Sequence, residues 1–414
     1  MKRTRGESGN VFRTGGFRAM LVATTADDLA QAAVPIALSF MVLQEGYSAL
    51  GLGLVLGLRS VTSLVFMVAG GWLGDRFSRA LVLVGANGLA GVALLILVAF
   101  SVSGRSSLTV LLAAAVVNGV FGALAAPASG ALVPLVVQED LIGTANSVVR
   151  LWTNGAAVGG AALAGIVASS SSAATSLALA GAAYIFAAAC YVPLIRFVRH
   201  ERLVVETLVG PLRAGWRILW KTPWIWITVV SFAAINAIYQ GAFLVLGPTI
   251  AATSFGSGGW GLIIAAQVVG FIIGGLLSIR FNKSRRLAIG YLCAITMAAP
   301  LIGLAFGAPL VVEMFLAAIA GIGGEQLAVA WATAIQKNVP LSNLSSVVAF
   351  DLIGSASLQP VGQLAIASVA VAIGDQIVLL GGAALILAVL VPTSLTDQIR
   401  RPQPVRSQIP AIPN

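Results

Sequence analysis

Long apolar runs constrain this chain of 414 residues more than any other feature. A helix that crosses a bilayer needs about 20 mainly apolar residues, because each residue adds about 1.5 Å along its axis. Only helices and closed barrels satisfy every backbone polar group inside lipid, and the runs lack the in-out alternation of barrel strands. We therefore predict an all-α, polytopic membrane protein with twelve transmembrane helices, at residues 19–43, 48–74, 80–102, 107–134, 145–168, 173–195, 224–246, 259–281, 287–306, 309–337, 345–371 and 377–396.

The composition supports lipid as the main solvent of the chain. Hydrophobic residues make up 58% of the sequence and charged residues 9%, whereas an average soluble domain has about 25% charged residues. The net charge of +10 is divided into short clusters between apolar runs, which is a membrane-topology pattern and excludes a basic stripe for nucleic acid. The expected partner is therefore the lipid bilayer, with no nucleic acid.

One long polar break divides the runs into two sets of six. The predicted parts are a cytoplasmic N-terminal segment, an N-terminal six-helix bundle, a cytoplasmic linker, a C-terminal six-helix bundle and a cytoplasmic tail, at 1–18, 19–195, 196–223, 224–396 and 397–414. In the linker, cations and tryptophans each recur every four residues. This spacing predicts an amphipathic helix on the inner lipid interface, and it is equally compatible with a solvated tether; the residues are Arg213, Trp216, Arg217, Trp220 and Lys221.

The basic residues predict the orientation of the chain. With a cytoplasmic N-terminus, all of the 24 Lys and Arg residues except Arg59 and Arg105 fall in or beside cytoplasmic segments. We expect a monomer in the cell (plasma) membrane with both termini in the cytoplasm.

A charged segment joins the second and third runs and has a degraded copy in the second half of the chain. It reads Gly-Gly-Trp-Leu-Gly-Asp-Arg-Phe-Ser-Arg at 70–79, and the copy reads Gly-Gly-Leu-Leu-Ser-Ile-Arg-Phe at 274–281. Aligned on the glycines, Asp75 is replaced by Ile279. A duplicated membrane unit with a charged hairpin at the same point is typical of a transporter.

This hairpin resembles the signature of the major facilitator superfamily, through Gly71, Leu73, Asp75, Arg76 and Arg79. The family pattern usually has Gly in place of Ser78 and a second basic residue in place of Ala80. Two further stretches, 127–147 and 331–362, resemble the drug:proton antiporter branch, which includes macrolide-efflux and siderophore-exporting members.

The resemblance implies two pseudo-symmetric six-helix bundles around a central cavity. It also implies that Asp75 faces the start of the eleventh helix, near Ser345 and Ser346, where unpaired backbone N–H groups attract a carboxylate and hold the inner gate shut. One departure concerns the fifth helix, where exporters usually carry Gly-Pro-x-x-Gly-Gly. Here Gly160 to Gly165 lack the proline, although their small side chains still permit tight helix contact.

Ionisable residues deep in the runs are the candidates for proton coupling, because such groups are costly in a membrane and usually functional. Asp27 and Asp28 lie about 15 Å into the first helix, and Arg59 lies at a similar depth in the second. A contact between them would either tune a carboxyl to exchange protons or form a static ion pair. Glu325, midway along the tenth helix, is the second candidate, whereas Asp351 is expected to form a cap or an interface ion pair.

Polar side chains inside the runs are the candidates for contact with a transported molecule. Each of them is also compatible with a role as a bridge between helices. The remaining lining is apolar and carries few fixed charges, which suits a bulky amphipathic or apolar molecule better than a sugar phosphate or a dicarboxylate. The candidates are Gln31, Asn118, Asn154, Asn236, Tyr239, Gln240, Gln267 and Gln359.

The sequence gives little support for a function other than transport. The chain has one histidine, and Cys190 and Cys293 lie inside apolar runs, so we expect no metal site and no cofactor. No phosphate-binding loop is present. We expect a secondary transporter, not an enzyme, that exports a drug-like or secondary-metabolite molecule by proton antiport, as in antibiotic efflux. The alternatives are a proton-coupled uptake symporter for a small organic solute and a scaffold that transports nothing.

Overall fold

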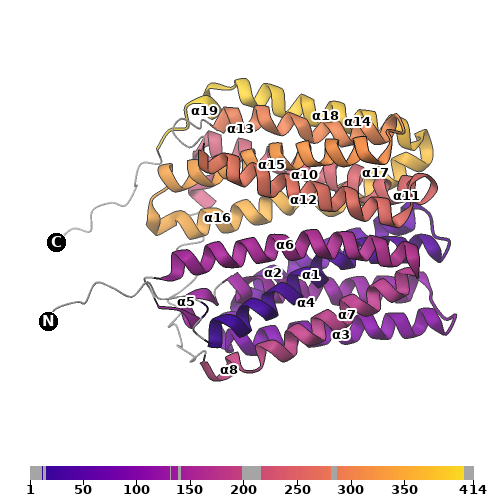
Figure 1. The fold of residues 1–414 in the computed structure, drawn as a ribbon. Helices are drawn as coiled ribbons and strands as arrows, with labels where there is room; N and C mark the ends of the chain where they lie inside the picture. Colours follow the sequence, from indigo (N-terminus) through magenta and orange to yellow (C-terminus); the bar gives the residue numbers. More distant parts are fainter. Residues whose placement is uncertain are drawn as a thin grey trace. The chain divides into compact units, whose positions relative to one another are not determined.

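Helices dominate the structure, a computed structural model that describes residues 12, 15–130, 132–138, 141–197, 216–280 and 287–404 (Figure 1). These residues include no strand. Within these described ranges, twelve helical stretches are long and apolar enough to cross a membrane, at Gly15–Gln44, Ala49–Met67, Arg79–Val102, Leu108–Ala126, Leu151–Ser170, Ala173–Arg196, Pro223–Ser254, Gly256–Ser278, Leu287–Ala305, Leu310–Asn338, Phe350–Ile373 and Asp375–Leu395. The prediction of an all-α protein with twelve membrane helices is confirmed.

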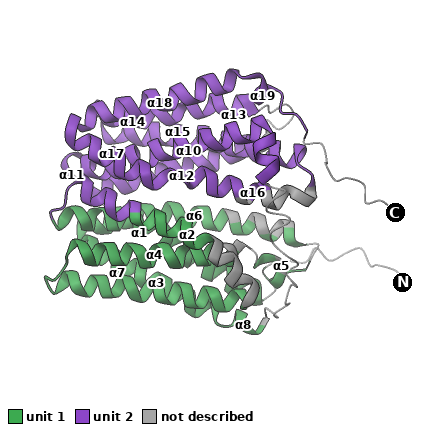
Figure 2. Ribbon diagram, turned by 180° about the vertical axis from the view of Figure 1, so that it is seen from behind, with its two compact units in different colours: residues 1–45, 58–203 green, residues 46–57, 204–414 purple. Residues whose placement is uncertain are grey.

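The chain forms two compact units, shown in different colours in Figure 2. The first comprises residues 1–45 and 58–203, and the second comprises residues 46–57 and 204–414. The boundary between the first and the second unit, after residue 203, falls inside the polar break at 196–223 of the sequence. The start of the second helix belongs to the second unit, because Gly53 and Gly57 pack closely against residues 360–367.

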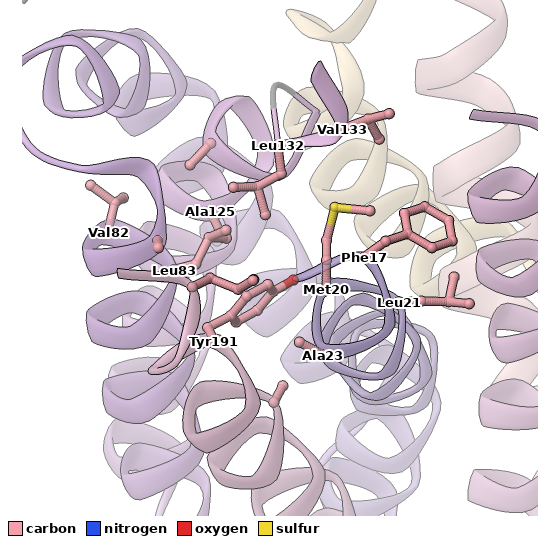
Figure 3. Packing of buried hydrophobic residues seen from close by; sticks show 14 of the residues in the cluster. Phe17, Met20, Leu21, Ala23, Val82, Leu83, Ala125, Leu132, Val133 and Tyr191 are labelled. Atoms are coloured by element: carbon pink, nitrogen blue, oxygen red, sulfur yellow. The ribbon is translucent and has the colours of Figure 1, made fainter. Parts of the chain in front are cut away.

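The first unit is built from long helices joined by short turns. Its elements are α1 (Gly15–Gln44), the greater part of α2 (Ala49–Arg76), α3 (Arg79–Val102), α4 (Leu108–Gly130), α5 (Val133–Val136), α6 (Ile142–Ser170), α7 (Ala173–Tyr191) and α8 (Leu194–Phe197). A cluster of buried side chains closes the end of this unit where α1 and α3 begin and where α4 and α7 end. Figure 3 shows this cluster, which includes Phe17, Met20, Leu83, Leu132 and Tyr191.

The second unit contains several interrupted helices. Its elements, after the start of α2, are a helix at 216–221, α10 (Pro223–Gly241), η3 (Ala242–Leu246), α11 (Gly247–Ser254), α12 (Gly256–Arg280), α13 (Leu287–Ala294), η4 (Ile295–Ala298), α14 (Ala299–Ala305), α15 (Leu310–Asn338), α16 (Leu341–Ala356), α17 (Gln359–Ile373), α18 (Asp375–Leu395) and α19 (Asp397–Arg400).

Proline explains where these helices are interrupted. Pro248, Pro300 and Pro360 each lie in the first turn of a new helical segment. Because proline has no N–H and its ring clashes with the preceding turn, the regular bonding pattern cannot continue through it. The chain adapts with a π-helical turn before Pro248 and a 3₁₀ turn before Pro300. The seventh span, predicted to end at 246, consequently runs through the π-turn to Ser254.

The described part of the linker is helical and docks on a neighbouring helix. Residues 216–221 form a helix in which Trp216 and Trp220 are exposed, and their ring centroids lie 5.6 Å apart. Trp216 also packs on Phe350 of α16, with ring centroids 5.5 Å apart. Arg213 lies outside the described residues. The position of this helix on the lipid interface stays a prediction.

Glycines bring helices into backbone contact in both units. At Gly160 of α6, an added Cβ would overlap the carbonyl of Leu29 in α1. In the second unit, a Cβ at Gly321 of α15 would overlap the carbonyl of Gln267 in α12. Lipid supplies no hydrophobic drive for helices to associate, so dispersion between close backbones stabilises these pairs. The tight contact expected near Gly160 is therefore present without the proline.

A glycine pair on α6 tests this packing. Gly160→Ala should lower the unfolding free energy by about 1–3 kcal/mol, because the new methyl group forces α1 and α6 apart. Gly159→Ala is the matched control, because a Cβ at Gly159 meets nothing within 4 Å. The measurement is the thermal unfolding midpoint of the purified protein in detergent. Equal midpoints for the two variants would contradict the account.

Candidate functional site

A polar cluster lies inside the first unit, on five of its helices. Asp27 of α1 is buried, and its Oδ1 accepts a hydrogen bond from Gln31 Nε2 at 3.4 Å, one helical turn away. Arg59 of α2 donates from Nε to Asn118 Oδ1 of α4 at 2.8 Å. Gly119 explains this second pair, since a Cβ there would crowd the Arg59 carbonyl. The close approach of α2 and α4 thus brings Arg59 to Asn118.

Two polar residues that the sequence analysis missed complete this cluster. Tyr184 of α7 is 3% exposed and lies within electrostatic range of Asp27, Asp28, Arg59 and Asn118. Asn87 of α3 is also buried, within side-chain reach of Asp27, and its Nδ2 donates to the Leu83 carbonyl at 3.1 Å. The feature of the sequence that could have identified each of them is a lone polar residue within an apolar run. We call Asp27, Asp28, Arg59, Asn87, Asn118 and Tyr184 the N-bundle cluster.

The direct contact expected between a carboxylate and Arg59 is not made. Among the residues that the structure describes, no ion pair joins Arg59 to Asp27 or Asp28. Asp27 and Arg59 instead each have a neutral amide as hydrogen-bond partner, which is Gln31 for Asp27 and Asn118 for Arg59. The carboxyls can therefore gain or lose a proton without breaking an ion pair.

Glu325 lies in the second unit where α15 packs against α12. A Cβ at Gly274 would lie 2.9 Å from the Cβ of Glu325, and one at Gly275 would lie 3.9 Å from its Oε1. The next residue, Gln326, donates from Nε2 to the Gly274 carbonyl at 2.8 Å and accepts from Ser278 Oγ at 3.2 Å. The degraded copy of the hairpin therefore provides the glycines that make room for Glu325.

Several of the candidate substrate contacts bridge helices of the second unit. Gln267 of α12 donates from Nε2 to the Tyr239 hydroxyl of α10 at 2.5 Å, and both side chains are buried. Asn236 donates from Nδ2 to the Ser355 carbonyl of α16 at 3.0 Å. In the first unit Asn118 is buried, whereas Asn154 is exposed. The candidates that are half-buried, and so retain free surface, are Gln31, Asn236, Gln240 and Gln359.

Asp351 is neither a helix cap nor part of an ion pair within the described ranges, which corrects the expectation. It lies well inside α16, where Trp331 Nε1 donates to its Oδ2 at 2.8 Å and Ser355 Oγ donates to its Oδ1 at 2.9 Å. The Trp331 ring packs edge-on against Trp224 with centroids 5.7 Å apart. Neutral donors thus satisfy both carboxyl oxygens, which fits a structural role.

Comparison with known proteins identifies the family. The sequence profile of the Major Facilitator Superfamily matches residues 20–362. The chain belongs to the major facilitator superfamily. It is therefore a multi-pass membrane transporter and not an enzyme. No curated protein matches the chain in sequence at a significant level.

Solved structures of other superfamily transporters share this fold. The nucleoside transporter NupG has a TM-score of 0.70 at 13% identity, with 92% of this chain and 98% of that one covered. A bacterial homologue of the human lysosomal transporter Spinster gives 0.72 at 14% identity, covering 94% and 96%. A bacterial homologue of the iron transporter ferroportin gives 0.67 at 16% identity, covering 92% and 98%. Identities this low show the fold and leave the substrate open.

The superfamily hairpin lies between α2 and α3. The α2 backbone is helical through Gly71, Leu73 and Asp75 to Arg76, and their side chains lie outside what the structure describes. The side chains of Ser345 and Ser346 are outside it as well. Arg79 begins α3, directly after Ser78, whose hydroxyl accepts the backbone N–H of Leu81 as an N-cap. The role of Asp75 as a gate latch stays a prediction.

The Arg59–Asn118 hydrogen bond gives a prediction for the first unit. Asn118→Leu should lower the unfolding free energy by about 1–3 kcal/mol, because it leaves the half-buried Arg59 guanidinium without its acceptor. Asn154→Leu is the matched control, because Asn154 is exposed. Thermal unfolding midpoints in detergent measure the difference. If Asn118→Leu were as stable as the control, the bond would have no structural importance.

Proposed function

We propose that this transporter exports a drug-like or secondary-metabolite molecule across the cell membrane in exchange for protons. The observation that carries the proposal is the N-bundle cluster, in which Asp27 is buried, Asp28 is half-buried, and neither is paired with Arg59. A carboxyl held in this way can bind a proton from one side of the membrane and release it to the other.

The cost of burying charge explains why such a cluster responds to protons. An ionised carboxylate away from water is expensive unless a cation or several donors compensate for it. Asp27 accepts one long hydrogen bond from Gln31, and Arg59 is bonded to Asn118. Gaining a proton removes the cost at Asp27, and losing it restores a negative charge that acts on Tyr184 of α7. Protonation therefore changes the electrostatic forces between α1 and α7.

The polar side chains with free surface favour a molecule of mixed character. Gln31, Gln240 and Gln359 are half-buried neutral amides, so they can donate and accept hydrogen bonds without demanding a charged solute. Tyr239 and Gln267 are bonded to each other and are less available. This arrangement supports an amphipathic or apolar substrate better than a phosphate, which needs several cations.

A proton-coupled uptake symporter is the second candidate. The observation that favours it is the sequence of α6, which lacks the proline that exporters of this superfamily usually carry in the fifth span. Uptake and export use the same fold and the same proton sites. The direction of transport distinguishes them.

Efflux from a susceptible host tests the proposal. Cells that express the chain should accumulate less of some members of a chemically varied panel of drugs, and a proton uncoupler should abolish the difference. Higher accumulation on expression would support uptake instead. A panel with no member affected in either direction would contradict transport of this class of solute.

The carboxyls of α1 provide the second part of this test. At least one of Asp27→Asn and Asp28→Asn should reduce uncoupler-sensitive efflux to the level of cells without the protein, because an amide cannot release a proton. Asp397→Asn is the control, because Asp397 is exposed in α19 at the end of the second unit. Protein abundance in the membrane is measured for each variant. Full efflux by both α1 variants would show that neither carboxyl carries the proton.

A further inference from the structure

Glu313 has the smallest exposed fraction of any carboxyl residue that the structure describes, and the sequence analysis did not single it out. It lies in the first turn of α15, and 0% of its surface is exposed. Glu325 lies on the same helix twelve residues later, about 18 Å along the axis. The two carboxyls therefore occupy different levels of the second unit.

Neither oxygen of the Glu313 carboxyl has a hydrogen-bond partner among the described residues. Acidic residues in the first turn of a helix commonly accept bonds from the free N–H groups there, but Glu313 does not. Its backbone N–H is bonded to the Pro309 carbonyl at 3.0 Å, so the main chain is regular and only the side chain is unsatisfied. An unsatisfied buried group in a native structure calls for an explanation.

The packing around this carboxyl leaves space for it and supplies no polar group. Gly303 of α14 faces it, and a Cβ at that position would overlap Glu313 Oε2. The same hypothetical Cβ would lie 2.7 Å from a methyl carbon of Leu316. The turn before α15 is fixed by Gly307, whose φ of 65° favours glycine, and by Pro309. Glycine at 303 thus allows the carboxyl to lie against the α14 backbone.

Few ionisable groups surround Glu313. The Tyr239 phenol of α10 is within electrostatic range of it, and phenols stay neutral at physiological pH. Among the elements packed against α15, α13 carries Tyr291, which interacts with Thr228, Ser231 and Asp351, and α16 carries Asp351, which is bonded to Trp331.

The remaining ionisable residues lie at other levels or at the surface. Cys293 of α13 lies level with Gly323, ten residues along α15 and about 15 Å from Glu313. Arg280 ends α12, and Asp375 is exposed at the start of α18. No described cation compensates Glu313, so an ionised carboxylate would be strongly disfavoured at this position.

We propose that Glu313 is a proton-binding site of the second unit, occupied by a proton in this conformation. Its proton would exchange at the end of the unit that carries the α14–α15 turn. An odd number of spans separates that turn from α19, so the turn lies at the end of the unit opposite to α19. Only the use of this proton in transport rests on the proposed function.

The site is linked to residues that are candidates for substrate contact. Tyr239 interacts electrostatically with Glu313 and accepts the hydrogen bond from Gln267. Its ring also stacks on Phe243 at a centroid distance of 4.9 Å. A change of charge at Glu313 would therefore act first on the Tyr239 hydroxyl, and through it on the contact between α10 and α12.

Infrared spectroscopy of the purified protein tests the site without any substrate. A protonated carboxyl gives a carbonyl stretch that shifts in heavy water, and Glu313→Gln should remove one such band from the spectrum at neutral pH. Glu45→Gln should leave the spectrum in this region unchanged, because Glu45 is exposed and accepts a hydrogen bond from Ser101. Because glutamine matches a neutral glutamic acid in shape, the Glu313 variant should keep the thermal stability of the parent protein.

A second variant keeps the test informative if Glu313→Gln fails to fold. Gly303→Ala retains the carboxyl and places a methyl group against Oε2. It should shift the frequency of the same band. If neither variant changes the protonated-carboxyl region of the infrared spectrum, the proposal is overturned. If the parent protein shows proton-coupled efflux but no such band, the Glu313 site is refuted and the proposed function stands. If it shows the band but its transport is not coupled to protons, only the proposed function is refuted.

Discussion

The cost of an ionised group away from water governs how this chain places its polar residues. Three of the charged residues placed inside the described helices meet neutral donors or acceptors in place of an opposite charge. Arg59 bonds to Asn118, Asp27 to Gln31, and Asp351 to Trp331 and Ser355. An ion pair would fix a charge state, whereas amides and hydroxyls can serve both the ionised and the neutral form. A protein arranged in this way can change protonation without dismantling its helix contacts.

Glycine determines where these groups meet. Gly119 lets α4 approach the backbone of α2 at Arg59. Gly274 leaves space for the side chain of Glu325, and Gly303 leaves space for the carboxyl of Glu313. In lipid, close helix contact depends on small residues, because side-chain burial gains little when the surroundings are equally apolar. Gly119, Gly274 and Gly303 therefore determine which neighbours these ionisable residues meet as well as how closely their helices pack.

The sequence alone was sufficient to predict the helical fold and its twelve spans, because run length and apolar character depend on local composition. It could not predict the partners of individual residues. The sequence predicts Asp27 and Arg59 at a similar depth, but in the structure Arg59 is bonded to Asn118 of α4. Glu313 was overlooked because an acidic residue near the start of a helix usually has an ordinary explanation, and only three-dimensional packing shows that its carboxyl is buried without a partner.

Proton movement during transport tests the central claim most directly. The protein is reconstituted into lipid vesicles that enclose a pH indicator, and a solute identified by efflux is added on one side without any imposed pH gradient. Antiport predicts that protons leave the compartment that the solute enters. It also predicts faster solute movement when a proton gradient is imposed in the direction opposite to that movement. Solute movement with no change of internal pH, or with protons travelling in the same direction as the solute, would contradict the account.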